Sequence, residues 1–168
     1  MDSKIKLRSY KKSDNADLIY LIEEMHKSMM HFDTLGEYGL KRGYGAVKLK
    51  EILKGVSKKS VLLYVAEVDR RVVGYVTGEI SEKPSKEEQL GLKFPLVRFG
   101  TINELYVDPQ YRELGVGIRL MDKIESSLRR KGCNCMSFGA YMQNKKAIEF
   151  YKGRGYTVAS VSLFKKFK

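Results

Sequence analysis

The sequence has few of the residues that form cross-links and bind metals. Its 168 residues include two cysteines and two histidines. Cys133 and Cys135, without further cysteines, make a poor zinc site, and a disulfide between residues so close in the chain would be strained. We therefore expect reduced thiols that pack as small apolar side chains, and a site without a metal.

Long apolar runs are also missing. No stretch approaches the roughly 18 consecutive apolar residues of a membrane span, and residues Met1 to Lys6 lack the apolar core of a signal peptide. The content of 43% hydrophobic and 31% charged residues is ordinary for a globular protein. The length suits one hydrophobic core. These features predict a single cytoplasmic domain over residues 1–168, without membrane contact.

Acidic residues are outnumbered by basic ones. The 32 Lys and Arg residues against 20 Asp and Glu residues give a formal charge of +12. This surplus favours anionic partners such as phosphates, acidic proteins or nucleic acid, but a lysine-rich solvated surface is the simpler explanation. Because no compact basic run with interleaved aromatics stands out, nucleic-acid binding rests on charge alone.

Hydrophobic periodicity predicts an alternation of strands and helices. Strand patterns cover residues 5–9, 61–68, 72–80, 99–107, 133–141 and 156–167. Helical patterns cover residues 14–30, 49–56, 120–128 and 144–155. This order predicts a mixed α/β sheet with helices on both faces.

The segment from Leu105 to Gly117 joins a strand to a helix through a glycine loop. At a helix N-terminus several main-chain N–H groups lack an intrahelical partner, and the helix dipole adds positive charge. The glycines let a phosphate approach the main chain, and Arg112 adds a cation at the rim. The segment lacks both the Gly-Lys-Ser/Thr ending of a P-loop and the three glycines of a dinucleotide fingerprint.

In this context the segment resembles the signature of the GNAT N-acetyltransferase superfamily, Arg/Gln-x-x-Gly-x-Gly/Ala after a Val-x-Pro strand end. Arg112, Gly115 and Gly117 fill the three defining positions, and Val107 and Pro109 match the lead-in. Residues 144–156 resemble the second motif of the family, Asn-x-x-Ala-x-x-Phe-Tyr-x-x-x-Gly-Phe/Tyr.

One position departs from the family signature. Glu113 stands where many members have glycine or a basic residue. An acidic side chain beside a pyrophosphate is unhelpful unless it turns to solvent, so Glu113 bears on affinity rather than on the family assignment. The resemblance implies the GNAT fold, a mixed, mostly antiparallel sheet of six to seven strands. It further implies about four helices on both faces and a splay at the fourth strand.

The resemblance also implies an activity, acetyl-CoA-dependent transfer of an acetyl group to a primary amine by direct attack. It implies Tyr151 as the general acid, and Glu104 is the candidate base on its strand, with Glu79 or ordered water as alternatives. The implied cofactor-binding residues are Leu105, Tyr106, Val107, Arg112, Glu113, Leu114, Gly115, Val116, Gly117, Ile118, Asn144 and Tyr151.

The acceptor and the partners stay open at this point. Loops near residues 29–45 and 81–95 would select a protein N-terminus, a lysine or a small amine, and their composition favours none of them. Two alternatives remain, a non-catalytic acyl-CoA-binding regulator and a basic nucleic-acid-binding protein. Members of the family are often dimers, which makes a homodimer an expectation without an interface.

Overall fold

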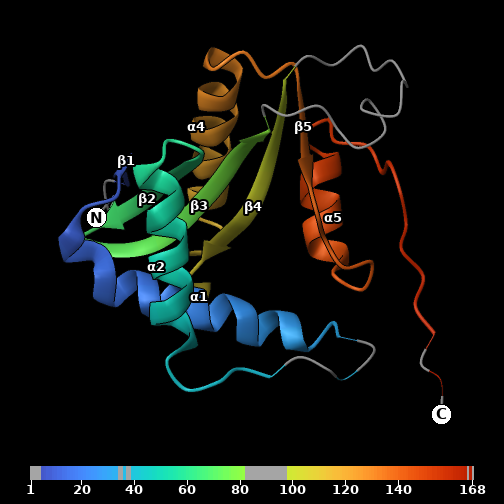
Figure 1. Ribbon diagram of the computed structural model, residues 1–168, viewed down its shortest axis with the longest axis horizontal. Helices are drawn as coiled ribbons and strands as arrows, with labels where there is room; N and C mark the ends of the chain where they lie inside the picture. Colours follow the sequence, from blue (N-terminus) through green and yellow to red (C-terminus); the bar gives the residue numbers. More distant parts are fainter. Residues whose placement is uncertain (1–4, 34–35, 37–38, 82–97, 166, 168) are drawn as a thin grey trace.

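The computed structural model describes residues 5–33, 36, 39–81, 98–165 and 167. Its five strands form one sheet in the order β1-β2-β3-β4-β5 (Figure 1). The strands are β1 Lys6–Ser9, β2 Val61–Val68, β3 Arg71–Ser81, β4 Phe99–Val107 and β5 Cys135–Phe138. The helices are α1 Asn15–Met30, α2 Tyr44–Ser57, α4 Val116–Arg130 and α5 Lys145–Lys152. All neighbouring strands are antiparallel except the parallel pair of β4 and β5.

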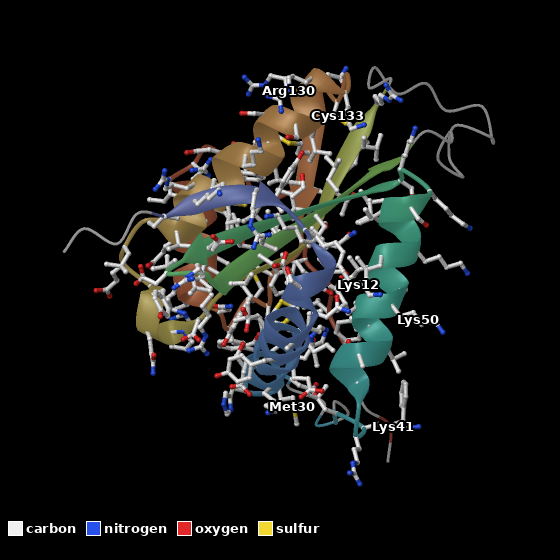
Figure 2. All side chains as sticks on the ribbon, turned by 90° about the vertical axis from the view of Figure 1, so that its left-hand side faces the viewer. Lys12, Met30, Lys41, Lys50, Arg130 and Cys133 are labelled. Carbon is white, nitrogen blue, oxygen red and sulfur yellow. The ribbon has the colours of Figure 1, made fainter. Side chains whose placement is uncertain are left out.

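The helices cover both faces of the sheet, as the sequence predicts (Figure 2). On one face, apolar side chains of α1 and α2, such as Leu18 and Leu49, pack against Val65 and Tyr75 of the sheet. On the other face, α4 packs through the residues at its helical spacing, which are Leu120, Met121, Ile124 and Leu128. Each helix therefore buries the apolar stripe that identified it in the sequence. None of the described helices is long and apolar enough to cross a membrane.

A β-bulge in β4 decides which side chains face which layer. Ile102 pairs with Gly78 and Glu104 pairs with Thr77, which leaves Asn103 as an extra, exposed residue. Because strand side chains alternate, one extra residue reverses the phase beyond it. Ile102 therefore packs in the core beneath α4, whereas Glu104 contacts the layer of α1 and α2.

The sheet splays beyond this bulge. β4 pairs with β5 only from Phe99 to Ile102, but it continues alongside β3 as far as Val107. From Asn103 to Val107, the edge of β4 on the side of β5 therefore has no strand partner among the described residues. The expected splay at the fourth strand is present.

The predicted last strand, residues 156–167, is wrong for the residues that the structure describes. Residues 156–165 form no strand, so the described sheet has five strands rather than six or seven. Alternating apolar residues show a surface suited to a strand, but a strand also needs a partner edge. β5 is likewise shorter than the expected 133–141. The predicted loop at 81–95 lies, apart from Ser81, outside the described residues.

Candidate functional site

The loop between β4 and α4 is built to expose main-chain N–H groups. The Asp108 carboxylate accepts a 3.0 Å hydrogen bond from Gln110 N and fixes the turn at Pro109–Tyr111. The first hydrogen bond of α4 runs from Arg119 N to Gly115 O, at 3.1 Å. The three preceding N–H groups, those of residues 116–118, have no intrahelical acceptor, and no side chain caps the helix. This is the geometry of an anion site.

The two glycines of the loop have different reasons for being glycine. Gly115 has a φ of +75°, and a Cβ placed there would meet nothing within 4 Å. A Cβ on Gly117 would lie 3.8 Å from Val107 Cγ2 and 4.0 Å from Phe150 Cζ, which is ordinary contact. The main-chain conformation therefore favours glycine at 115, whereas position 117 has room for a methyl group.

Glu113 adopts the same left-handed conformation without being glycine. Its φ is +68° and its side chain is exposed. A side chain in this region strains the main chain. Glu113, the residue that departs from the family signature, is therefore also strained in its main chain. Its exposed side chain turns the carboxylate to solvent.

Arg112 ties the loop to the end of β4. Its Nε donates a 3.1 Å hydrogen bond to Val107 O, and its guanidinium carbon lies 5.5 Å from the centre of the Tyr106 ring. These contacts of Arg112 hold the loop against the end of β4. Two exposed apolar side chains lie nearby, Leu114 in the loop and Ile118 in the first turn of α4.

Tyr151 lies beside the splay on the face of α4 and α5. Asn144 caps α5 by accepting a 3.3 Å hydrogen bond from Ala147 N. The Tyr151 ring packs 4.2 Å from the ring of Phe138, at the end of β5, and is 8% exposed. Burial, followed by the neighbouring Tyr156, raises the pKa of Tyr151 above its ordinary value. No hydrogen-bond partner of its hydroxyl is present in the described part of the chain.

Glu104 lies on the opposite face of the sheet. Its Oε2 accepts a 2.9 Å hydrogen bond from the Tyr75 hydroxyl, and its Oε1 lies 3.7 Å from Lys48 Nζ. The side chain is buried, as is that of its cross-strand neighbour Thr77. The Thr77 hydroxyl is buried without a hydrogen-bond partner among the described residues. Glu104 and Tyr151 therefore flank β4 from its two faces rather than touching one another.

The surroundings of Glu104 were not predicted from the sequence. Lys48 is on α2, and no local pattern indicates that it lies across the layer from β4. In the sequence, Tyr75 has the pattern of an ordinary strand residue. Only the structure shows that its hydroxyl donates a hydrogen bond to Glu104. The second candidate base, Glu79, is exposed and accepts a 3.4 Å hydrogen bond from Asn103. No cluster of potential metal ligands occurs within the described residues.

Curated relatives match parts of the chain. It is 29% identical over 93 residues to an uncharacterised N-acetyltransferase of Methanocaldococcus jannaschii, over 55% of this chain and 38% of that protein. It is 35% identical over 54 residues to thialysine N-epsilon-acetyltransferase of Mus musculus, over 32% of each chain. The matched region thus spans 38% of the length of the first relative and 32% of the length of the second.

Solved structures share the fold over nearly the whole chain. Aminoglycoside N-acetyltransferase AAC(6')-Iy in complex with CoA has a TM-score of 0.74 at 16% identity, covering 99% of this chain and 96% of that one. Glucosamine-6-phosphate N-acetyltransferase of Arabidopsis thaliana has a TM-score of 0.65 at 18% identity, covering 98% and 99%. The sequence model of the Acetyltransferase (GNAT) family matches residues 23–156. This match spans the glycine loop, the splayed strand and the second motif, and the chain belongs to that family.

Proposed function

We propose that the chain is an acetyl-CoA-dependent N-acetyltransferase that acts on a primary amine. The observation that carries this proposal is the edge of β4 from Asn103 to Val107, which has no strand partner among the described residues and is followed, after the loop of residues 108–115, by the N-terminus of α4. The free edge offers main-chain donors and acceptors to the amides of a pantetheine arm. The N–H groups of residues 116–118 offer a pyrophosphate site next to it. Acetyl-CoA would supply an acetyl group activated as a thioester.

Glu104 is proposed as the base that takes a proton from the acceptor ammonium. An alkylamine with a pKa of about 10 must lose a proton before it becomes a nucleophile. Tyr75 and Lys48 each hold one carboxylate oxygen, at 2.9 Å and 3.7 Å. The lysine ammonium places a positive charge beside one oxygen, and the hydrogen bond from the tyrosine fixes the direction of the carboxylate. Thr77, whose hydroxyl has no hydrogen-bond partner in the described part of the chain, adds a donor and acceptor beside this base.

Tyr151 is proposed as the acid that protonates the departing thiolate. A phenol has an ordinary pKa of about 10, so Tyr151 is protonated at neutral pH and enters the reaction as a donor. Its ring is held by Phe138 and Phe150, whose ring centres lie 4.2 Å and 5.1 Å from its own. The base and the acid thus act from opposite faces of β4, with the acceptor on the side of α1 and α2 and the cofactor on the side of α4 and α5.

Relatives support a nitrogen acceptor. Proteins named for N-acetylation of thialysine, aminoglycosides and glucosamine-6-phosphate are among those similar to this chain. These acceptors differ in charge and size, so the amine nitrogen is what they share. A panel of lysine analogues, aminoglycosides, amino sugars and peptide N-termini covers this range.

The experiment joins a binding measurement to a transfer measurement. Acetyl-CoA at millimolar concentration should raise the melting temperature, because a ligand that binds only the folded chain stabilises it. Release of CoA thiol, followed with a thiol reagent across the amine panel, then reports transfer. Absence of any thermal shift would sink the proposal. A shift without thiol release on any amine would favour the acyl-CoA-binding regulator instead.

A further inference from the structure

Lys48 and Glu104 place opposite charges side by side on the face of the sheet that α1 and α2 cover. Lys48 Nζ lies 3.7 Å from Glu104 Oε1. The Glu104 side chain is 7% exposed and that of Lys48 is 27% exposed, so the carboxylate lies deeper and the ammonium lies nearer the surface. Burial alone would lower the pKa of Lys48, but the Glu104 and Glu51 carboxylates raise it above its ordinary value. Lys48 is therefore a cation at neutral pH.

The Lys48 ammonium has N–H groups that the described residues do not use. A lysine ammonium carries three donors. Among the described residues it makes one hydrogen bond, at 3.4 Å, to the carboxylate of Glu51, whose side chain is 72% exposed. The distance from Lys48 to Glu104 is that of an ion pair without a direct hydrogen bond. A cation that served only to neutralise Glu104 would gain by donating to it directly. The geometry therefore leaves Lys48 able to bind a second anionic group.

The start of α2 fixes where this ammonium lies. Tyr44, one turn before Lys48, has its hydroxyl 2.8 Å from Nε2 of His26 on α1. Gly45 packs so closely on α1 that a Cβ placed there would lie 2.6 Å from Ile19 O. Because close-packed helices do not shift without losing such contacts, the first turn of α2 is held against α1. Lys48, on the next turn, is thereby held in a fixed position relative to the buried carboxylate.

We propose that the acceptor is a zwitterionic amine, in which a carboxylate or phosphate lies a few bonds from the amine that is acetylated. This inference rests on the proposed function and names the class of its acceptor. The ammonium of the acceptor binds Glu104, the proposed base, and the anionic group binds Lys48 nearer the surface. An acceptor with a cationic tail instead sets a like charge against Lys48, which selects against it.

A matched series of amines tests the acceptor class with the wild-type chain and acetyl-CoA. β-Alanine and phosphoethanolamine carry the anionic group, propylamine and ethanolamine lack it, and diaminopropane carries a cation instead. The kcat/KM from release of CoA thiol, corrected for the pKa of each amine, should rank anionic above neutral above cationic acceptors. The first and last should differ at least about tenfold, and the better of the two anions identifies the group. Equal values across the series, or a preference for the diamine, would overturn this inference and leave the transferase proposal standing.

Variants of Lys48 test the residue itself. Lys48→Met should reduce the preference for anionic over neutral acceptors to within about twofold, and Lys48→Arg should retain the preference. The ratio is the readout, because loss of Lys48 also removes a charge beside Glu104 and so changes the absolute rates. Lys50→Met is the matched control, since Lys50 is exposed on the same helix (Figure 2), and it should leave the ranking unchanged.

Two outcomes with these chains contradict the inference in different ways. A folded Lys48→Met chain that keeps the wild-type ranking would overturn the role of Lys48 and the inference with it. Absence of thiol release from every amine of the series and of the wider panel would overturn the proposed function, on which the inference rests.

Discussion

The Tyr75 hydroxyl donates a 2.9 Å hydrogen bond to Glu104 Oε2, and both side chains are buried between the sheet and the layer of α1 and α2. Burial, with the nearby Glu104 charge, raises the pKa of Tyr75 well above its ordinary value, so the phenol stays a donor. A buried carboxylate without partners would be costly. Here Tyr75 and Lys48 satisfy one oxygen each, which keeps the carboxylate in a fixed direction.

Glu104→Gln tests this carboxylate as the base. The amide keeps the shape of the side chain and can still accept the hydrogen bond from Tyr75, but it takes no proton from an ammonium. We expect kcat to fall by about 10²–10⁴-fold, the usual contribution of a general base. The affinity for acetyl-CoA, measured by calorimetry, should not change. Unchanged kcat at pH 7 would remove Glu104 from this role.

Tyr151→Phe tests the acid on the other face of β4. The substitution keeps the ring contacts with Phe138 and removes only the hydroxyl. We expect kcat to fall by about 10²-fold or more with little change in acetyl-CoA affinity or melting temperature. Tyr156→Phe is the control, since its hydroxyl bonds to Glu125 and has no proposed chemical role. Its expected effect is a small loss of stability with turnover retained, and similar losses of kcat in both variants would contradict the assignment.

The elements that the sequence predicted well are those whose pattern is local. The apolar runs of β2 and β3 predict buried strands, and the structure buries both faces of these strands. The helical spacing of Leu120, Ile124 and Leu128 predicts one apolar face, and the structure buries that face. The glycine loop was equally readable, because a left-handed Gly115 and free helical N–H groups are properties of a few consecutive residues.

Features that depend on distant partners were not predictable in the same way. The bulge at Asn103 reverses the face of Glu104, and nothing in the strand pattern marks the extra residue. The proximity of Lys48 to Glu104 depends on how α2 packs over the sheet. The last predicted strand failed for a related reason, since alternation in residues 156–165 cannot show whether an edge within the same chain is within reach.

A pair of alanine substitutions separates the two glycines of the loop. Gly115→Ala should cost about 1–2 kcal/mol of unfolding free energy, because a Cβ is disfavoured at its φ of +75°. It should also weaken acetyl-CoA binding by disturbing the start of α4. Gly117→Ala should be nearly neutral, since its Cβ would make only ordinary contacts with Val107 and Phe150. Chemical denaturation measures the unfolding free energy of both variants, and calorimetry measures their affinity for acetyl-CoA. Equal losses in the two variants would contradict the prediction.

Glu113→Gly should tighten the binding of acetyl-CoA. The change removes a carboxylate next to the proposed pyrophosphate site, and charges near a helix N-terminus are worth enough to shift affinity roughly two- to fivefold. Glycine also accepts the φ of +68° without strain. Glu113→Gln separates the effect of the charge from the effect of the main-chain strain, because it removes the charge and keeps a side chain at the same φ. If charge is responsible, both variants bind more tightly at low salt and the gain shrinks at high salt.

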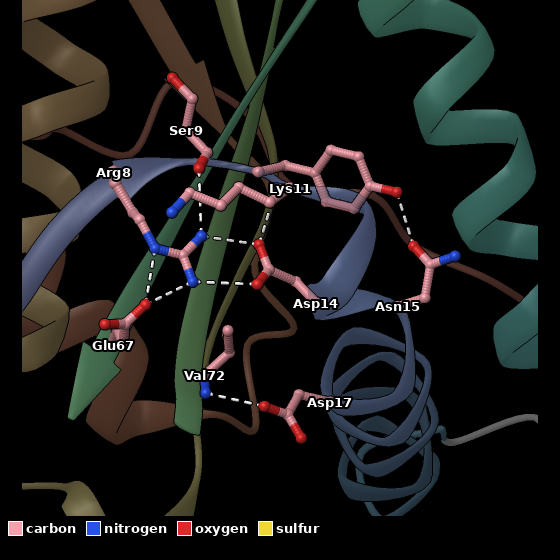
Figure 3. A network of polar contacts seen from close by, with 9 residues as sticks. Arg8, Ser9, Lys11, Asp14, Asn15, Asp17, Glu67 and Val72 are labelled. Atoms are coloured by element: carbon pink, nitrogen blue, oxygen red, sulfur yellow. Dashed lines mark hydrogen bonds and ion pairs between the residues drawn. The ribbon is translucent and has the colours of Figure 1, made fainter. Parts of the chain in front are cut away.

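The partly buried ion pairs of Arg8 predict how the free energy of unfolding depends on pH. Arg8 joins Asp14, at 2.7 Å, to Glu67 and so links β1, the start of α1 and β2 (Figure 3). Burial alone would raise the pKa of Asp14, but hydrogen bonds from Arg8 and from Lys11 N lower it below its ordinary value. The stabilisation is therefore complete above the unfolded pKa of about 3.9 and is lost as the pH falls through the lower folded value.

Asp14→Asn should accordingly cost about 2 kcal/mol of unfolding free energy at pH 7, because it removes a charged partner of Arg8. The difference from wild type should shrink as the pH is lowered below about 4, since the wild-type carboxyl then becomes neutral too. Glu24→Gln, which breaks the exposed pair with Lys27, should change stability little at any pH. Urea unfolding at several pH values measures all three chains. A deficit of Asp14→Asn that stays constant down to pH 2 would show that the ion pair does not stabilise the fold.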